Sequence, residues 1–180
     1  QALSQLNFLQ EIANCAFFQT TFLRRMIPVD QKLNPLSCSS EILSMFAQFY
    51  SVEDVICMIE YIPFLSSSLT MKEYSYEIRS NYAETLAYIL RNPDTHVVAF
   101  ESKVPENCVS SLCQYHDPSL IKVWKCISNL IEFNEYIPAF LSKTFQSICT
   151  HLLESPYTHN QEIINFHLPI LHFLDLYLPK

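Results

Sequence analysis

The chain has 180 residues, of which 49% are hydrophobic and 16% charged, a composition that excludes an intrinsically disordered segment. It contains no glycine, whereas phosphate-binding loops, dinucleotide-binding turns and nucleophile elbows all require glycine. The net charge is −7 and no basic run is longer than Arg24-Arg25, which argues against direct binding of nucleic acid. We therefore expect helices joined by Pro, Ser, Asn and Asp, and a protein that is not an enzyme and has no cofactor.

The cysteines and the start of the chain bear on the compartment. The 7 cysteines are an odd number and lie mostly in apolar patterns, as at Cys57, Cys126 and Cys149, which favours free thiols in a reducing compartment. Gln1 already lies in a helical pattern, and no apolar run reaches the ~20 residues of a membrane span. The prediction is an intracellular protein, cytoplasmic or nuclear, with one helical domain over residues 1–180 that is a fragment of a larger protein.

The first part of the chain has helical periodicity. Apolar residues at helical spacing predict a helix over residues 3–22, and the segment from Pro28 to Pro35 is expected to be a loop. A second helix is predicted to begin after Ser40, with its apolar face continuing through Phe46, Phe49 and Tyr50.

Three further helix starts are predicted from capping residues. Ser51-Val52-Glu53-Asp54 and Thr70-Met71-Lys72-Glu73 both have the capping-box pattern, in which a hydroxyl accepts from a backbone amide and an acid three residues later reaches back. The first is expected to open a helical stretch through Leu65, and the second a long helix towards Leu90. Asp117-Pro118 predicts a further start, because aspartate caps helices and proline is favoured at the first helical position.

Apolar helical stretches recur along the sequence at a regular interval. Counting back from Ile127 by this interval gives Leu86, then Met45, then Ser4, and counting forward gives Leu168. The interval is about 41 residues, and a repeat of roughly this length with two or three helices is typical of armadillo and HEAT arrays. The alternative is an irregular helical bundle in which the spacing is accidental.

The last third carries more specific phrases. They are Asn134-Glu135-Tyr136-Ile137-Pro138-Ala139-Phe140-Leu141, Leu152-Leu153-Glu154-Ser155-Pro156 and Gln161-Glu162. Together these resemble an armadillo repeat, best over residues 117–176, although the loop glycines of that family are absent and Lys125 stands where it has tryptophan. The resemblance implies an all-α fold, a right-handed α-solenoid of armadillo/HEAT-like repeats.

In such arrays the third helix of each unit lines a groove that holds a partner. The resemblance therefore implies a set of partner-binding residues, and the alternatives are solvated helix positions for the polar members and core positions for the three apolar ones. The set is Asn81, Glu84, Tyr88, Lys122, Lys125, Asn129, Ile163, Phe166 and Ile170.

One cluster could hold a metal ion. Cys108, Cys113 and His116 have the spacing C-x4-C-x2-H and could supply three zinc ligands, with Cys126 or His96 as a fourth. The two cysteines lie in an apolar helical run, where a thiol behaves as a small hydrophobic side chain. We therefore expect no metal site.

These observations lead to a functional prediction of a non-catalytic protein–protein interaction scaffold that docks a peptide or helix of a partner in a multi-subunit complex. A mean hydropathy of +0.11 fits a surface that is partly covered by other chains. The alternatives are a purely structural stretch of a large HEAT-type protein, and a helical regulatory subunit of an enzyme or of a nucleic-acid-processing complex. A short helical or extended segment is the expected partner, with no direct contact to nucleic acid or membrane.

Overall fold

A computed structural model describes Glu11, residues 35–115, residues 117–132 and Thr150. All regular structure in this part of the chain is helical, with six α-helices, two 3-10 helices and no strand, so the all-α prediction is confirmed there. Within the same residues, every helix is too short or too polar to cross a lipid bilayer. The elements in chain order are α2 (Pro35–Phe49), η1 (Asp54–Tyr61), α3 (Ile62–Ser68), α4 (Tyr76–Ile89), η2 (Pro93–Thr95), α5 (His96–Glu101), α6 (Val104–Gln114) and α7 (Ser119–Glu132).

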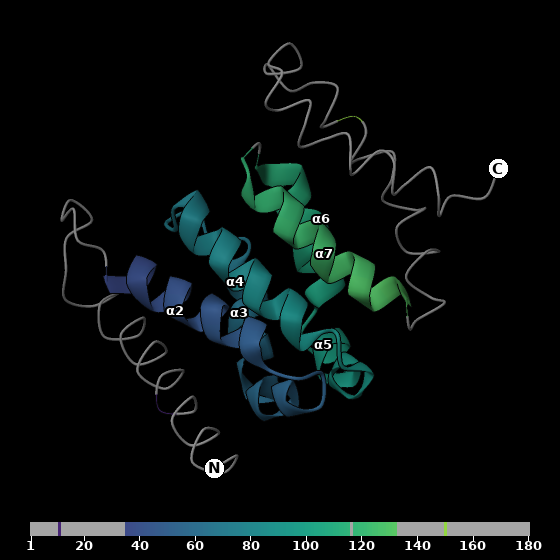
Figure 1. Ribbon diagram of the computed structural model, residues 1–180. Helices are drawn as coiled ribbons and strands as arrows, with labels where there is room; N and C mark the ends of the chain where they lie inside the picture. The colour runs from purple at the N-terminus through teal and green to yellow at the C-terminus, as the bar shows by residue number, and fades with distance from the viewer. Residues whose placement is uncertain (1–10, 12–34, 116, 133–149, 151–180) are drawn as a thin grey trace.

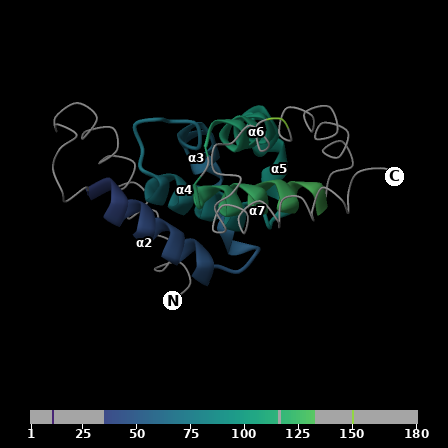
Figure 2. The same cartoon turned by 90° about the horizontal axis from the view of Figure 1, so that it is seen from above.

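The helices form two layers. Helices α2, α4 and α7 lie side by side with α4 in the middle, and α3, α5 and α6 pack behind them (Figures 1 and 2). The core lies between the layers and includes the fully buried side chains of Leu65, Tyr82, Leu86, Leu112 and Ile127. Each large apolar side chain buried in this way contributes about 1.5–3 kcal/mol, so this core supplies the main stabilisation of both layers.

The order of the helices recurs along the chain at a nearly constant interval. The front-layer helices α2, α4 and α7 begin at Pro35, Tyr76 and Ser119, and the 3-10 helices η1 and η2 begin at Asp54 and Pro93. Helices α3 and α6 of the second layer show the same relation. Each of these steps is about 40 residues, the length of a helical repeat of the armadillo or HEAT type. The series α2, η1, α3 is therefore followed by a similar series, α4, η2, α5, α6, in which α5 has no counterpart, and α7 comes next.

Two of the predicted helix starts are correct. Ser51 Oγ accepts from the Asp54 amide at 3.1 Å and donates to Asp54 Oδ2 at 2.9 Å, at the entrance of the 3-10 helix that continues into α3. Asp117 Oδ1 accepts from the Ser119 amide at 3.0 Å, which caps α7. In both cases the short polar side chain satisfies an amide that has no partner in the first turn.

The predicted start at Thr70 is wrong. Thr70 Oγ1 donates to the carbonyl of Ser67 at 3.2 Å, so the threonine closes the end of α3 and opens no helix. Turn residues follow as far as Ser75, whose hydroxyl accepts from the Ile78 amide at 3.5 Å and caps α4. A threonine hydroxyl can donate to a backbone carbonyl or accept from a backbone amide. The capping-box pattern in the sequence does not distinguish these two roles.

The start and the apolar face predicted for the second helix are also wrong. The helix begins at Pro35, and Ser40 is a buried residue inside it, donating to the carbonyl of Ser37 at 2.8 Å. Phe49, predicted on the apolar face, is 82% exposed, and Met45, which the repeat interval aligned with buried Leu86, is 51% exposed. Apolar residues occupy two sides of α2, and the side that meets the core is formed by Leu43 and Ala47.

The absence of glycine has one visible consequence. Lys103, which joins α5 to α6, has φ of 56° and ψ of 36°, the left-handed conformation that glycine adopts most readily. Lys103 is the only described residue with positive φ. Other junctions between described helices have negative φ, with proline in the first turn, as at Pro63 and Pro93, or with polar caps.

Candidate functional site

Six of the residues predicted to bind a partner lie on α4 or α7, in the layer formed by α2, α4 and α7. Most of these six contact a neighbouring helix. Glu84 is the central case. Its Oε2 accepts from Ser44 Oγ of α2 at 3.1 Å, and its Oε1 pairs with the ammonium group of Lys122 on α7. One carboxylate on α4 is therefore bonded to both neighbouring helices.

The two asparagines of the predicted set also join helices. Asn81 Nδ2 donates to Ser40 Oγ of α2 at 3.0 Å, and Asn129 Nδ2 donates to the carbonyl of Ala87 on α4 at 2.6 Å. Each amide thus uses one donor to hold its own layer together. This arrangement leaves less hydrogen-bonding capacity for the backbone of a bound peptide than the prediction supposed.

The remaining predicted residues differ in exposure. Tyr88 is half-buried, and the guanidinium carbon of Arg91 lies 4.7 Å from the centre of its ring. Lys125 is exposed, so its charge is available on the outer side of α7. The last three, Ile163, Phe166 and Ile170, lie outside the described residues.

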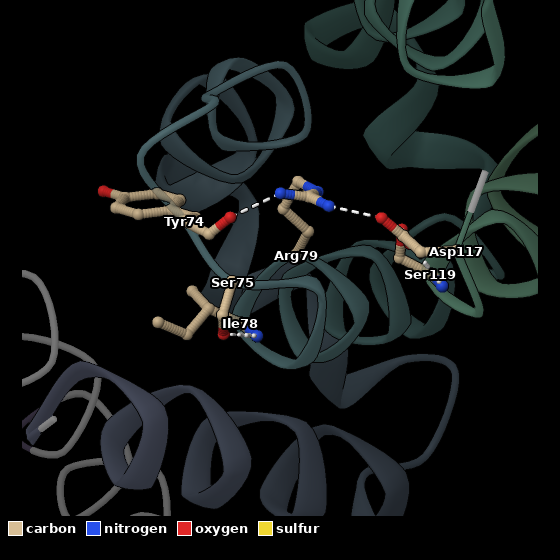
Figure 3. A network of polar contacts seen from close by, with 6 residues as sticks. All are labelled: Tyr74, Ser75, Ile78, Arg79, Asp117 and Ser119. Atoms are coloured by element: carbon tan, nitrogen blue, oxygen red, sulfur yellow. Dashed lines mark hydrogen bonds and ion pairs between the residues drawn. The ribbon is translucent and has the colours of Figure 1, made fainter. Parts of the chain in front are cut away.

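A buried ion pair that sequence reasoning did not identify joins α4 to α7. Arg79 is 5% exposed, and its Nη2 lies 2.5 Å from Asp117 Oδ2 (Figure 3). Its Nη1 donates to the carbonyl of Tyr74, and its guanidinium carbon lies 3.8 Å from the centre of the Tyr115 ring. Arg79 is thus held by the turn that precedes α4 and by the connection between α6 and α7.

Asp117 performs two tasks with its two oxygen atoms. Oδ2 pairs with Arg79, while Oδ1 accepts from the Ser119 amide and from the Ser119 hydroxyl (Figure 3). The capping role was predicted, and the ion pair was not. A charged residue among the apolar positions Ile78 and Tyr82 of one helix was the available signal, because buried arginine requires a partner. The arrangement fixes the start of α7 against α4.

Cys126 and His96, the possible fourth ligands of the candidate zinc cluster, both contact backbone carbonyls. Cys126 Sγ donates to the carbonyl of Ala83 at 3.2 Å, and burial, with a smaller effect of the neighbouring Cys108, raises the pKa of Cys126 well above its ordinary value. His96 bonds through Nε2 to the carbonyl of Leu90 at 2.9 Å. His116 lies outside the described residues, and within them no group of three or more His, Cys, Asp or Glu side chains could hold a metal ion.

An exposed apolar stripe on α2 is a further feature that was not identified from the sequence. Ile42, Met45 and Phe49 are 42%, 51% and 82% exposed, and they follow one another at helical spacing. The apolar exposure continues beyond the helix at Val52 and Ile56. Helical periodicity predicts an apolar face through Phe49, but periodicity does not show whether another element covers that face.

Searches against protein-family models, curated proteins and solved structures find no match to this chain. The functional argument therefore rests on the geometry of the chain itself. Two features of that geometry can carry it: a layer of helices tied together by polar side chains, and the exposed apolar stripe at the edge of that layer.

Proposed function

We propose that the chain is a non-catalytic scaffold for protein–protein interaction, built from helical repeats of the armadillo/HEAT type, which docks a helix or peptide of a partner within a complex. The observation that carries this proposal is the recurrence of the helix order between Pro35 and Ser119. Stacked helical units of about 40 residues form extended surfaces, and such surfaces bind other macromolecules.

Hydrogen bonds between the units support the repeat interpretation. Asn81 bonds to Ser40, and Asn107 Nδ2 donates to Ser66 Oγ at 2.9 Å, so in each layer an asparagine reaches a serine that lies 41 residues earlier. In each case, two positions that are equivalent in a 41-residue repeat are hydrogen-bonded to each other. An irregular bundle has no reason to place the same pair of residue types at the same separation in both of its layers.

The intracellular location belongs to the same proposal. The five described cysteines, Cys38, Cys57, Cys108, Cys113 and Cys126, are free thiols. A chain with several free thiols suits a reducing compartment, where partners are recruited by surface contacts and disulfides are rare.

Affinity capture followed by reconstitution tests this function. The full-length protein is used as bait, captured proteins are identified by mass spectrometry, and each is then expressed and titrated against the bait to measure a Kd. We expect at least one direct protein partner. A Lys125→Glu variant and a Met45→Ser/Phe49→Ser variant then report whether the partner uses α7 or α2.

Asn129→Ala is unsuitable for that purpose, since its amide holds α7 to Ala87 and a loss of binding would be confounded by a loss of stability. The outcome against the proposal is that no captured protein binds the bait directly once both are purified. A purely structural stretch of a larger helical protein, the main rival, would give that result.

A further inference from the structure

The exposed apolar side chains of the described residues are concentrated in one segment. Of the seven large hydrophobic residues that are exposed there, five lie between residues 42 and 56, and the other two are Tyr76 and Val97. On α2, exposed Cys38 and the exposed residues Ile42, Met45 and Phe49 have the sequence spacing i, i+4, i+7 and i+11. This spacing is the contact line that one helix presents to another in a coiled-coil-like packing.

The charged residues in the sequence segment that carries this stripe have one sign. No lysine or arginine occurs from Pro35 to Met71, whereas Glu41, Glu53, Asp54 and Glu60 all lie in that segment and are exposed. Glu41 directly precedes Ile42 on α2, and the other three follow the end of the helix. At the C-terminal end of α2 the half-buried guanidinium of Arg91 donates to the carbonyl of Tyr50 at 3.2 Å, so the exposed charged side chains of this segment are all carboxylates.

We propose that the exposed stripe of α2 docks an amphipathic helix of a partner protein, one with apolar side chains at 3–4 residue spacing and lysine or arginine along its flanks. This inference rests on the proposed scaffold function and names the chemistry of the partner. The stripe supplies buried apolar area, and the four carboxylates favour a basic helix and speed its approach.

Charge complementarity favours a basic helix over two other possible occupants of the stripe, a second copy of the chain and an anionic lipid surface. A second copy of the chain would bring the same four carboxylates to the same face, and like charges placed against one another disfavour that pairing. An anionic lipid surface would also repel the segment, which lacks basic residues from Pro35 to Met71. A basic helix is the occupant for which both the apolar and the charged features are favourable.

Two synthetic peptides, each long enough for about five helical turns, test the proposal. Both have leucine at alternating 3- and 4-residue spacing; one has lysine at the remaining positions and the other has glutamate. Fluorescence anisotropy of each labelled peptide, titrated with the full-length protein, gives a Kd. We expect the lysine peptide to bind, with a Kd that rises with salt, and the glutamate peptide to bind about tenfold more weakly or worse.

Matched variants locate the site. Met45→Ser/Phe49→Ser is expected to raise the Kd of the lysine peptide about tenfold, and Glu41→Gln/Glu60→Gln about threefold with a flatter salt dependence. The controls are Val97→Ser, which removes an apolar side chain that is 67% exposed on α5, and Glu101→Gln/Glu106→Gln. Neither control should change the Kd by more than about twofold.

The proposal is overturned if the controls weaken binding as much as the α2 variants, or if the two peptides bind equally well. These outcomes differ from failure of the scaffold function. A partner that binds the purified protein and loses affinity with Lys125→Glu but not with Met45→Ser/Phe49→Ser would keep the scaffold and reject the α2 site.

Discussion

The two sides of α4 are joined to their neighbours in different ways. Towards α7, the contacts include the buried ion pair of Arg79 with Asp117 and the pair of Lys122 with Glu84. Towards α2, they are hydrogen bonds such as that of Asn81 with Ser40 at 3.0 Å, without an ion pair between described residues of the two helices. Ion pairs therefore stabilise the α4–α7 junction, whereas hydrogen bonds connect α2 to α4. Helix α2 also has an exposed apolar face.

The largest expected effect is at the buried ion pair. Arg79→Met should lower the free energy of unfolding by about 3 kcal/mol, because it leaves Asp117 without its partner at a largely buried position. Urea denaturation followed by circular dichroism measures the change. Lys122→Met is the comparison: the Lys122 side chain is 28% exposed, against 7% for Arg79, and Glu84 keeps the bond that it accepts from Ser44, so we expect a loss of about 1 kcal/mol or less.

The double variant Arg79→Met/Asp117→Asn sharpens this result. It removes both charges while the asparagine retains an oxygen for capping Ser119, so it should be less destabilised than the sum of the two single variants. Additive losses would mean that Arg79 and Asp117 act independently, and the account of the α4–α7 junction would then be wrong.

The asparagines give a smaller contrast between the two sides. Asn129→Ala should cost about 1 kcal/mol, since it removes the donor to the Ala87 carbonyl. Asn81→Ala should cost less, because Ser40 Oγ retains its own bond to the Ser37 carbonyl at 2.8 Å. Thermal unfolding of the two variants measures the order, and a larger loss at Asn81 would reverse the comparison.

The all-helical fold was predictable because composition and helical periodicity are local properties of the sequence. The absence of glycine, the cap at Asp117 and the regular interval between apolar stretches all indicated a helical fold. The ion pair was not predictable in this way. Its members are separated by 38 residues, and only the packing of α4 against α7 brings them together.

The contacts between side chains on the candidate surface were harder to predict than the fold. Asn81, Glu84 and Asn129 were expected to face a partner, yet each forms a hydrogen bond or ion pair with a neighbouring helix. Phe49 of the stripe was predicted on the apolar face of its helix, but α2 carries apolar residues on two sides and only one of these sides meets the core. A repeat register shows which positions are equivalent, but the size of the neighbouring side chains decides which of them are covered.

Lys103 provides a test that does not involve the helix layers. Lys103→Gly should raise the free energy of unfolding by less than about 1 kcal/mol, because glycine removes the cost of the left-handed conformation but adds entropy to the unfolded chain. Lys72→Gly, at an exposed turn position without positive φ, is the control and should give no stabilisation. Equal shifts in Tm for the two variants would contradict the role assigned to Lys103.

The smallest effect is expected at the carboxyl of Glu53. Its own backbone amide and the hydroxyl of Ser51 hold the pKa of Glu53 below its ordinary value. A lowered pKa means that the associated stabilisation is present above the ordinary value and is lost as the pH falls through the lowered one. Ser51→Ala should move the pKa of Glu53 part of the way towards its ordinary value, as measured by NMR titration of the side-chain carboxyl; an unchanged pKa would contradict the effect assigned to Ser51.

Site-directed photo-crosslinking in cells tests the central claim most directly, because it identifies both a partner and the surface that it touches. A benzophenone amino acid is placed at position 45 on α2, at position 125 on α7, or at position 97 on α5 of the full-length protein. We predict a protein crosslink from position 45 to a helical segment rich in lysine and arginine, and none from position 97. Crosslinks to protein from neither position 45 nor position 125 would contradict the account of this chain as a docking scaffold.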